Sequence, residues 1–271
     1  MSQCSITFKM KSLFTIIFVF IALGSFEQSQ NDSGQKLVCQ FERILYWRDF
    51  QGDSKNISVY DSLVDANDQF EKSLLNVTSK NPKTIGFDFK QLKERGLWIS
   101  TSDDGLFRIY SWDTWTGGTM HFQQNIFQYK SGKKIFARIL PDPLSEEDDY
   151  SVKWYMRIYT VHTSKHTYYL GLYDCTYSTK DAYQGVKAFA INDTVLNDSV
   201  KLIKTGTGIK NNLGFDYDFF SVVDRKERPI YLISYNKETT TLRIPIVLDE
   251  GKVTNRFIDY KFKGRYFERK T

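Results

Sequence analysis

Residues 111–121, with the sequence SWDTWTGGTMH, bring together the side chains best suited to hold a ligand. Two tryptophans and a histidine offer flat rings, an aspartate offers a carboxylate, and two adjacent glycines let the backbone approach a ligand closely. Aromatic rings stack on the C–H faces of sugars, and a carboxylate accepts hydrogen bonds from their hydroxyl groups. The candidate binding residues are therefore Trp112, Asp113, Trp115, Gly117, Gly118 and His121. The alternative is that the tryptophans fill a core and the glycines only turn the chain, because aromatic residues dominate β-sheet cores.

Two further histidines offer a candidate metal site. His162 and His166 flank the tip of a predicted hairpin, so their rings could bind zinc if a carboxylate joined them. The alternative is a solvated hairpin tip, in which Lys165 between the two histidines repels a cation. No cofactor is expected, because the sequence has no G-x-S-x-G, G-x-x-x-x-G-K-[ST], H-E-x-x-H or C-x-x-C motif.

Several aspartates could supply the two carboxyl groups that hydrolysis of a glycosidic bond requires. Asp216 and Asp218 are two residues apart, which places them on one face of a strand, where like charges raise one pKa. Exposed strand faces commonly carry such pairs, so no catalytic residue is assigned. The aspartates considered are Asp103, Asp104, Asp113, Asp216, Asp218 and Asp224.

The N-terminus has the pattern of a secretory signal peptide. Lys9 and Lys11 precede an apolar run at residues 13–23, and the small residues Gly24 and Ser25 follow it. The run is too short to cross a bilayer comfortably, and Ser25 stands where a bacterial lipoprotein would need cysteine. We therefore predict a cleaved signal peptide at residues 1–24 and export to the periplasm or the cell exterior, with no transmembrane segment after cleavage. Met10 is an alternative initiator.

Charge and cysteine content limit the partners of the exported chain. Residues 25–271 hold 35 basic and 32 acidic residues, which does not favour a nucleic-acid partner. The most basic stretch, residues 261–270, interleaves lysine and arginine with aromatic residues, and an edge strand protected by charge explains it best. Cys39 and Cys175 can form one disulfide or stay as two free thiols.

The elements that must position these residues are mainly strands. Residues 25–36 are polar and indicate a flexible leader, and residues 37–271 form a single β-rich domain. Apolar residues recur every three to four positions at about 59–79, which predicts an amphipathic helix; a short helical turn at 91–95 is expected to end at Gly96. From residue 97 onward apolar residues alternate, for example Val152, Trp154, Met156 and Ile158 on one face, and strands are also expected at 215–223 and 230–235. Turns are expected at 103–105 and 131–132, and a long loop at Pro141 and Pro143. We predict an antiparallel, multi-stranded β domain, propeller-like or sandwich, with the N-terminal helix packed on it.

Two hairpins resemble the inner hairpin of a WD40-type propeller blade. The first is WISTSDDGLFRIYSWD at residues 98–113, followed by TGG at 116–118; a looser copy spans YLISY at 231–235, TLRI at 241–244 and GKV at 251–253. The whole sequence also resembles exported hypothetical proteins of Bacteroidota, which implies a secreted location and no particular activity. Neither resemblance assigns a catalytic residue.

These observations predict a non-catalytic binding or interaction protein of the periplasm or cell surface. Its ligand is unknown; carbohydrate and a cell-envelope protein are the partners considered. The alternative is a secreted glycan-active hydrolase that uses two of the aspartates. A buried pair of carboxylates with shifted pKa values, in a cleft beside Trp112, would favour the hydrolase, whereas scattered surface acids would favour binding.

Overall fold

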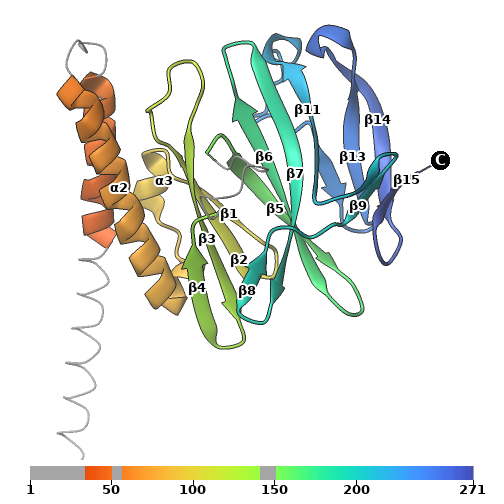
Figure 1. Cartoon of the computed structure of the whole chain (residues 1–271), viewed down its shortest axis with the longest axis horizontal. Coiled ribbons are helices and arrows are strands. Elements are labelled where there is room, and N and C mark those ends of the chain that lie inside the picture. The colour runs from red at the N-terminus through yellow and green to blue at the C-terminus, as the bar shows by residue number, and fades with distance from the viewer. Residues whose placement is uncertain (1–33, 51–56, 141–150, 271) are drawn as a thin grey trace, which may run out of the picture.

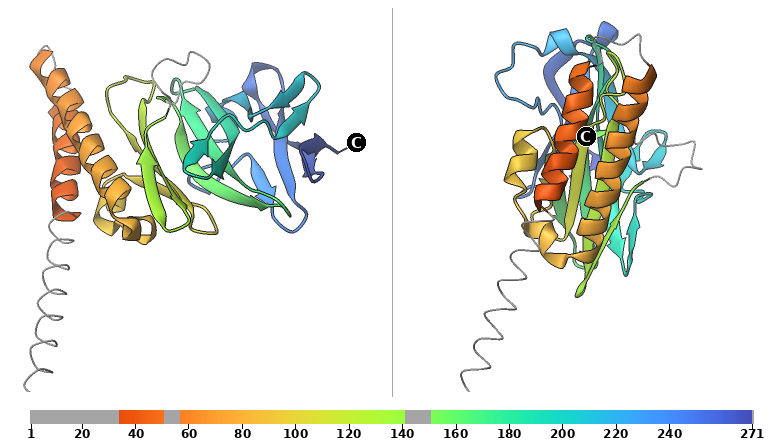
Figure 2. Two further views of the ribbon diagram at one scale, coloured as in Figure 1. Left: turned by 60° about the horizontal axis from the view of Figure 1, so that its bottom comes forward. Right: turned by 90° about the vertical axis from the view of Figure 1, so that its left-hand side faces the viewer.

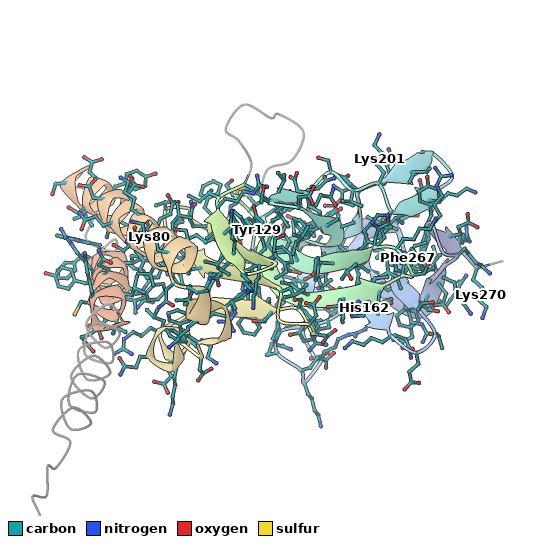
Figure 3. The ribbon with its side chains drawn as sticks, turned by 90° about the horizontal axis from the view of Figure 1, so that it is seen from below. Lys80, Tyr129, His162, Lys201, Phe267 and Lys270 are labelled. Atoms are coloured by element: carbon teal, nitrogen blue, oxygen red, sulfur yellow. The ribbon has the colours of Figure 1, made fainter. Side chains whose placement is uncertain are left out.

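The computed structural model describes residues 34–50, 57–140 and 151–270. The predicted signal peptide, residues 25–33 of the predicted leader and the predicted loop with Pro141 and Pro143 lie outside these ranges. The described residues form four layers along the long axis, a layer of helices followed by three sheets that we call A, B and C (Figure 1). Figure 3 shows the same order of layers, with Lys80 in the helical layer, Tyr129 in sheet A and Lys270 beyond sheet C.

Sheet A is an antiparallel meander of four consecutive strands. Its tight turns lie at the predicted positions, and Gly105 (φ 68°) and Gly132 (φ 57°) adopt the left-handed conformation that such turns favour. The strands are β1 (Trp98–Thr101), β2 (Phe107–Asp113), β3 (Gln123–Ser131) and β4 (Lys134–Arg138), in that order.

Sheet B lies in the middle and is antiparallel throughout. Its order is β11-β7-β6-β5, and the short strand β8 (Val195–Asn197) pairs with β7. The other strands are β5 (Trp154–His162), β6 (Thr167–Thr176), β7 (Asp181–Asn192) and β11 (Asn212–Asp218).

Sheet C has the order β10-β9-β15-β14-β13-β12 and is antiparallel except for the β15–β9 pair. The strands are β9 (Ile203–Thr205), β10 (Gly208–Lys210), β12 (Ser234–Asn236), β13 (Thr241–Val247), β14 (Val253–Phe262) and β15 (Phe267–Arg269). The prediction that residues 261–270 form an edge strand is wrong, because β14 and β15 each have a neighbour on both sides. Their charges therefore do not protect an edge.

Two long helices cover the outer face of sheet A and run side by side (Figure 2). One spans residues 34–50 and the other is α2 (Ile57–Lys80), which matches the helix predicted at 59–79. Phe41 and Phe70 meet edge to face, with ring centroids 4.9 Å apart, and both are buried. No helix of the described residues is long and apolar enough to cross a membrane.

The first of these helices differs from the prediction. Residues 34–36, predicted as part of the leader, form its first turn. The helix forms because Leu37, Val38, Phe41 and Ile44 lie at helical spacing and bury one apolar stripe against α2 and sheet A. After η2 (Pro82–Gly86), the short helix α3 (Lys90–Glu94) ends at Gly96 (φ 113°), as predicted.

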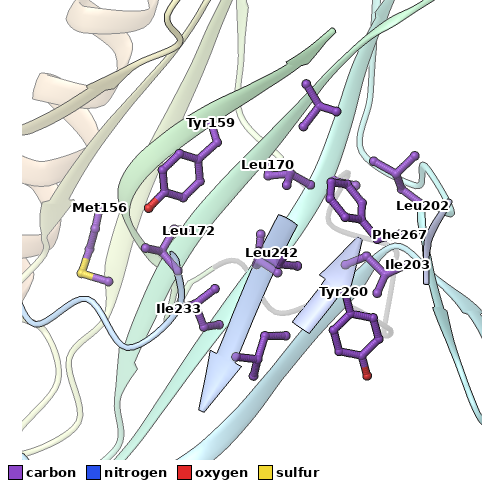
Figure 4. Close-up of a cluster of buried hydrophobic side chains, with 14 residues drawn as sticks. Met156, Tyr159, Leu170, Leu172, Leu202, Ile203, Ile233, Leu242, Tyr260 and Phe267 are labelled. Atoms are coloured by element: carbon purple, nitrogen blue, oxygen red, sulfur yellow. The ribbon is translucent and has the colours of Figure 1, made fainter. Parts of the chain in front are cut away.

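Sheet B is buried on both faces, so the molecule has two cores between sheets. Aromatic residues such as Phe107, Phe127 and Phe189 fill the space between sheets A and B. Aliphatic residues such as Leu170, Leu172 and Leu242 dominate the space between sheets B and C (Figure 4). This stacking confirms the predicted mainly β fold. Of the two predicted architectures, propeller-like and sandwich, the sandwich fits the stacked sheets.

A bulge in β5 overturns one predicted face. The pairing of β5 with β6 shifts register between Tyr155 and Arg157. As a result Ile158 packs toward sheet A, whereas Trp154 and Met156 face sheet C. Val152 lies in a turn before β5 and also packs toward sheet A. A bulge inserts one residue into a strand and reverses the alternation beyond it.

Two other predicted strands are shorter than expected. The strand predicted at 215–223 ends at Asp218, where the carboxylate accepts a hydrogen bond from the Phe220 N–H (2.9 Å) and begins η3 (Phe219–Ser221). Of the strand predicted at 230–235, residues 230–233 form no strand. Their backbone instead bonds to a buried glutamine side chain of sheet B.

No disulfide joins Cys39 and Cys175 in this structure, so the pairing considered from the sequence is not formed. Cys39 is exposed in the helical layer, whereas Cys175 is buried between sheets A and B. Sheet A separates the two layers and keeps the thiols apart.

Candidate functional site

The residues of the site predicted around 111–121 do not all gather at one surface. Trp112 is only 1% exposed and faces the helices, where its ring meets Phe70 edge to face at 5.0 Å. Its indole Nε1–H donates to Oδ1 of Asn67 (3.0 Å). Trp112 is therefore a core residue, and its predicted role in binding is wrong.

Asp113, Trp115 and His121 do come together, at the end of β2. The Asp113 carboxylate accepts from the Trp115 backbone N–H (2.7 Å) and lies 2.7 Å from His121 Nδ1. This hydrogen bond raises the pKa of His121 above its usual range. The guanidinium of Arg48 covers the Trp115 ring at 5.1 Å from its centroid, so a protein cation already occupies that face.

The two glycines of this segment serve the turn. A Cβ on Gly117 would lie 2.1 Å from the carbonyl oxygen of Met120, which only glycine avoids. A Cβ on Gly118 would meet no atom within 4 Å. The close approach at Gly117 is thus to the chain itself rather than to a ligand.

The histidines at the β5–β6 hairpin tip have local partners. His162 Nδ1 lies 3.3 Å from the Thr167 hydroxyl, and the His166 ring lies against Tyr168. Within the described ranges, no group of three histidine, cysteine or acidic side chains could hold a metal ion.

Another cavity, which we call the main cavity because its wall contains an acid and two tryptophans, lies on the face of sheet B that looks toward sheet C and has a volume of about 530 Å³. Loop residues 228–230 stand where sheet C does not cover this face. Apolar side chains make up most of the wall, with a few polar groups among them, as is typical of small-molecule sites. The wall consists of Trp98, Trp154, Met156, Ala182, Tyr217, Phe219, Pro229 and Ile230, together with Asp174, Thr176, Ser178, Thr179 and Arg228.

Two tryptophans from different sheets form one side of the cavity. Trp98 comes from β1 and Trp154 from β5, and their rings meet edge to face at 5.1 Å. Trp98 is fixed by its indole N–H, which donates to the carbonyl of Met156 (3.0 Å). Both rings are half-buried and present apolar surface to the cavity.

Asp174 supplies the single carboxyl group among the described residues of the wall. It sits on β6, directly between Trp154 of β5 and Gln184 of β7. Its Oδ1 accepts hydrogen bonds from the Tyr217 hydroxyl (3.0 Å) and from Gln184 Nε2 (3.3 Å), whereas Oδ2 accepts none from the described residues. Burial raises the pKa of this carboxyl to about 7, although the two hydrogen bonds oppose the shift.

The loop wall is attached to sheet B through Gln184. This fully buried side chain donates to the carbonyl of Ile230 (3.0 Å) and accepts from the N–H groups of Leu232 (2.7 Å) and Ile233 (2.9 Å). At the loop's other end, the Arg228 guanidinium donates to the carbonyls of residues 223, 225 and 227. The Arg228–Pro229 peptide bond is cis.

The sequence contains one signal for Asp174. The strand TYYLGLYDCT is otherwise aromatic, apolar or neutral, and an acid among such residues is unusual because acids are rarely buried. The aspartates considered from the sequence have structural roles instead. Asp104, for example, accepts from the Tyr169 hydroxyl (2.9 Å), and Asp218 starts η3 and pairs with Lys180 at 3.8 Å.

The chain matches no protein-family model, no curated protein and no solved structure. Its function must therefore be inferred from the chemistry of the cavity.

Proposed function

We propose that this chain is an exported, non-catalytic binding protein whose main cavity holds a small amphiphilic molecule. The ligand has a flat apolar body and one hydrogen-bond donor, an amine or a hydroxyl. The body lies against Trp98, Trp154 and Ile230, and the donor reaches Oδ2 of Asp174. A cavity of about 530 Å³ is of the size that small-molecule ligands occupy.

The observation that carries this proposal is the carboxyl oxygen of Asp174 that faces an apolar cavity without a protein donor. Asp174 is half-buried and its Oδ2 is open to the cavity, so a ligand that fills the cavity removes this oxygen from water. That removal costs free energy unless the ligand donates a hydrogen bond to the oxygen. A ligand donor avoids the cost, and a cationic donor adds an electrostatic attraction to the ionised acid. The wall offers one carboxyl group rather than two, which supports binding over glycoside hydrolysis.

The test uses three probes that share an indole ring but differ in their polar group: tryptamine, tryptophol and indole-3-propionate. At about pH 8, where Asp174 is ionised, we expect the amine to bind most tightly, the alcohol less tightly and the carboxylate not at all. Isothermal titration calorimetry measures the three affinities. Asp174→Asn should weaken tryptamine binding by about tenfold or more, because a charge-assisted hydrogen bond contributes roughly 1.5–3 kcal/mol.

A matched control separates this effect from a change in net charge. Asp193→Asn removes the same charge at an exposed turn after β7, where asparagine tolerates the left-handed backbone (φ 51°). It should leave all three affinities unchanged. Equal binding of the three probes, or equal losses in the two variants, would contradict the proposal.

Saccharides are a second ligand class, favoured by Thr176, Ser178 and Thr179 at one end of the cavity. A pyranose ring has a flat C–H face for Trp154 and hydroxyl donors for Asp174. Methyl glycosides in the same titration test this class. Binding that is tighter than that of tryptophol would assign the cavity to sugars.

A further inference from the structure

A second cavity, of about 560 Å³, lies at the β12–β13–β14 end of sheet C and is polar. Thr241, Arg243, Asp259 and Lys261 contribute side chains from β13 and β14, and they alternate with buried residues such as Leu242 and Tyr260. They therefore project from the outer face of sheet C, away from sheet B. We call this cavity the outer groove. Ser234 and Asn236 of β12 border it on one side and Lys270 on another.

The outer groove is lined by more positively charged side chains than negatively charged ones. The guanidinium of Arg243 pairs with the carboxylate of Asp259 at 3.0 Å. Lys261 and Lys270 make no ion pair with any residue of the described ranges. Glu268, the cross-strand neighbour of Lys261, pairs with Lys204 at 3.2 Å instead. Two ammonium groups thus remain available in the outer groove.

These charges have no structural explanation of the kind predicted from the sequence. Residues 261–270 were expected to protect a sheet edge, but β14 and β15 lie inside sheet C. Lys270 lies at the end of the molecule farthest from the helical layer (Figure 3). Its backbone N–H donates to the carbonyl of Asp259 (2.7 Å), which fixes the chain beside the groove.

We propose that the outer groove binds an acidic saccharide. Its anionic group lies between the ammonium groups of Lys261 and Lys270, and its hydroxyl groups bond to Ser234, Asn236 and Thr241. This site is independent of the main cavity.

The arrangement favours a saccharide over a nucleic acid. Binding of single-stranded nucleic acid relies on a long basic track and on aromatic rings that stack with successive bases. The outer groove has only two free cations. Its own tyrosine, Tyr235, packs its ring against Tyr159 and Phe267 in the core.

The experiment titrates the full chain with trigalacturonic acid at low ionic strength (about 20 mM salt), where surface charges are weakly screened. Maltotriose is the neutral probe of equal length. We expect the acidic trimer to bind and maltotriose to bind at least tenfold more weakly. Lys261→Ala and Lys270→Ala should each weaken binding of the acidic trimer by about threefold to fivefold, the range for single exposed charge pairs.

Lys165→Ala is the matched control, because it removes one exposed lysine from the β5–β6 hairpin tip, outside the groove. It should leave the affinity unchanged, and thermal melting should show all three variants folded. Inorganic phosphate and a short thymidine oligonucleotide complete the panel. Equal affinity for maltotriose, an equal loss in Lys165→Ala, or tighter binding of phosphate or of the oligonucleotide would overturn the proposal.

Discussion

Asp174 is the residue on which the account of the main cavity depends. Its pKa is raised from 3.8 to about 7, so the folded chain binds this proton more tightly than the unfolded chain does. The carboxyl group therefore contributes stability that is fully present below the unfolded pKa and is lost as the pH rises through about 7. An acid that lowers stability at neutral pH is typical of a functional site rather than of a structural one.

Substitutions at Trp112 and Trp154 are expected to have different effects on stability and on ligand binding. Trp112→Ala should destabilise the fold by about 3–5 kcal/mol, because it empties a buried site and leaves Asn67 without its donor. Trp154→Ala should cost less stability, because that ring is already half-exposed to the cavity, but it should weaken tryptamine binding.

Urea denaturation and calorimetry measure the two effects. Trp112→Ala should keep its affinity for tryptamine under conditions in which it is folded. A loss of affinity in Trp112→Ala alone would return the site to the segment 111–121.

At the scale of elements, the main cavity exists because one side chain holds the loop wall. Gln184 makes three hydrogen bonds to the backbone of residues 230–233, and the segment forms no strand of its own. The loop thus stands where a sheet would otherwise close the space above Asp174.

Gln184→Ala should therefore loosen this wall. The N–H groups of Leu232 and Ile233 would be left buried and unpaired, at about 1–3 kcal/mol each. Amide hydrogen exchange should quicken at these two residues, while the β13–β14 pairing stays protected. Exchange that quickens equally in both places would indicate global destabilisation instead.

The sequence predicts elements well where the signal is local. Helical spacing identifies α2, and glycines mark the turns of sheet A and the end of α3, because these features depend on neighbouring residues. The bulge in β5 is not predictable in this way, since pairing with β6 determines it.

The candidate site is predictable only in part, because its contacts join distant residues. Tyr217 lies 43 positions from Asp174, and Ile230 lies 46 positions from Gln184. Strand order alone brings them together. Trp112 misled for a related reason: Arg108, on the same face of β2, suggests that this face is solvated, but the helices bury it.

At the scale of the whole molecule, stacking three sheets under a helical layer creates two kinds of surface. Both faces of sheet B are covered by other layers, so the main cavity is largely apolar. Such a cavity favours a ligand with apolar surface, whose burial removes that surface from water. The outer face of sheet C is uncovered by any described residue, so the outer groove is polar and charged. An amphiphile in the first site and an acidic saccharide in the second would both suit an exported protein of the cell envelope.

The pKa of the Asp174 carboxyl group reveals whether a ligand donor reaches this residue. Carbon-13 NMR of the aspartate-labelled chain follows this group through a pH titration, and the Asp174→Asn variant identifies its signal. Without ligand the signal should titrate near pH 7. With saturating tryptamine it should titrate at a clearly lower pH, because a bound cation favours the ionised form. An unchanged titration in the presence of tryptamine would contradict the account.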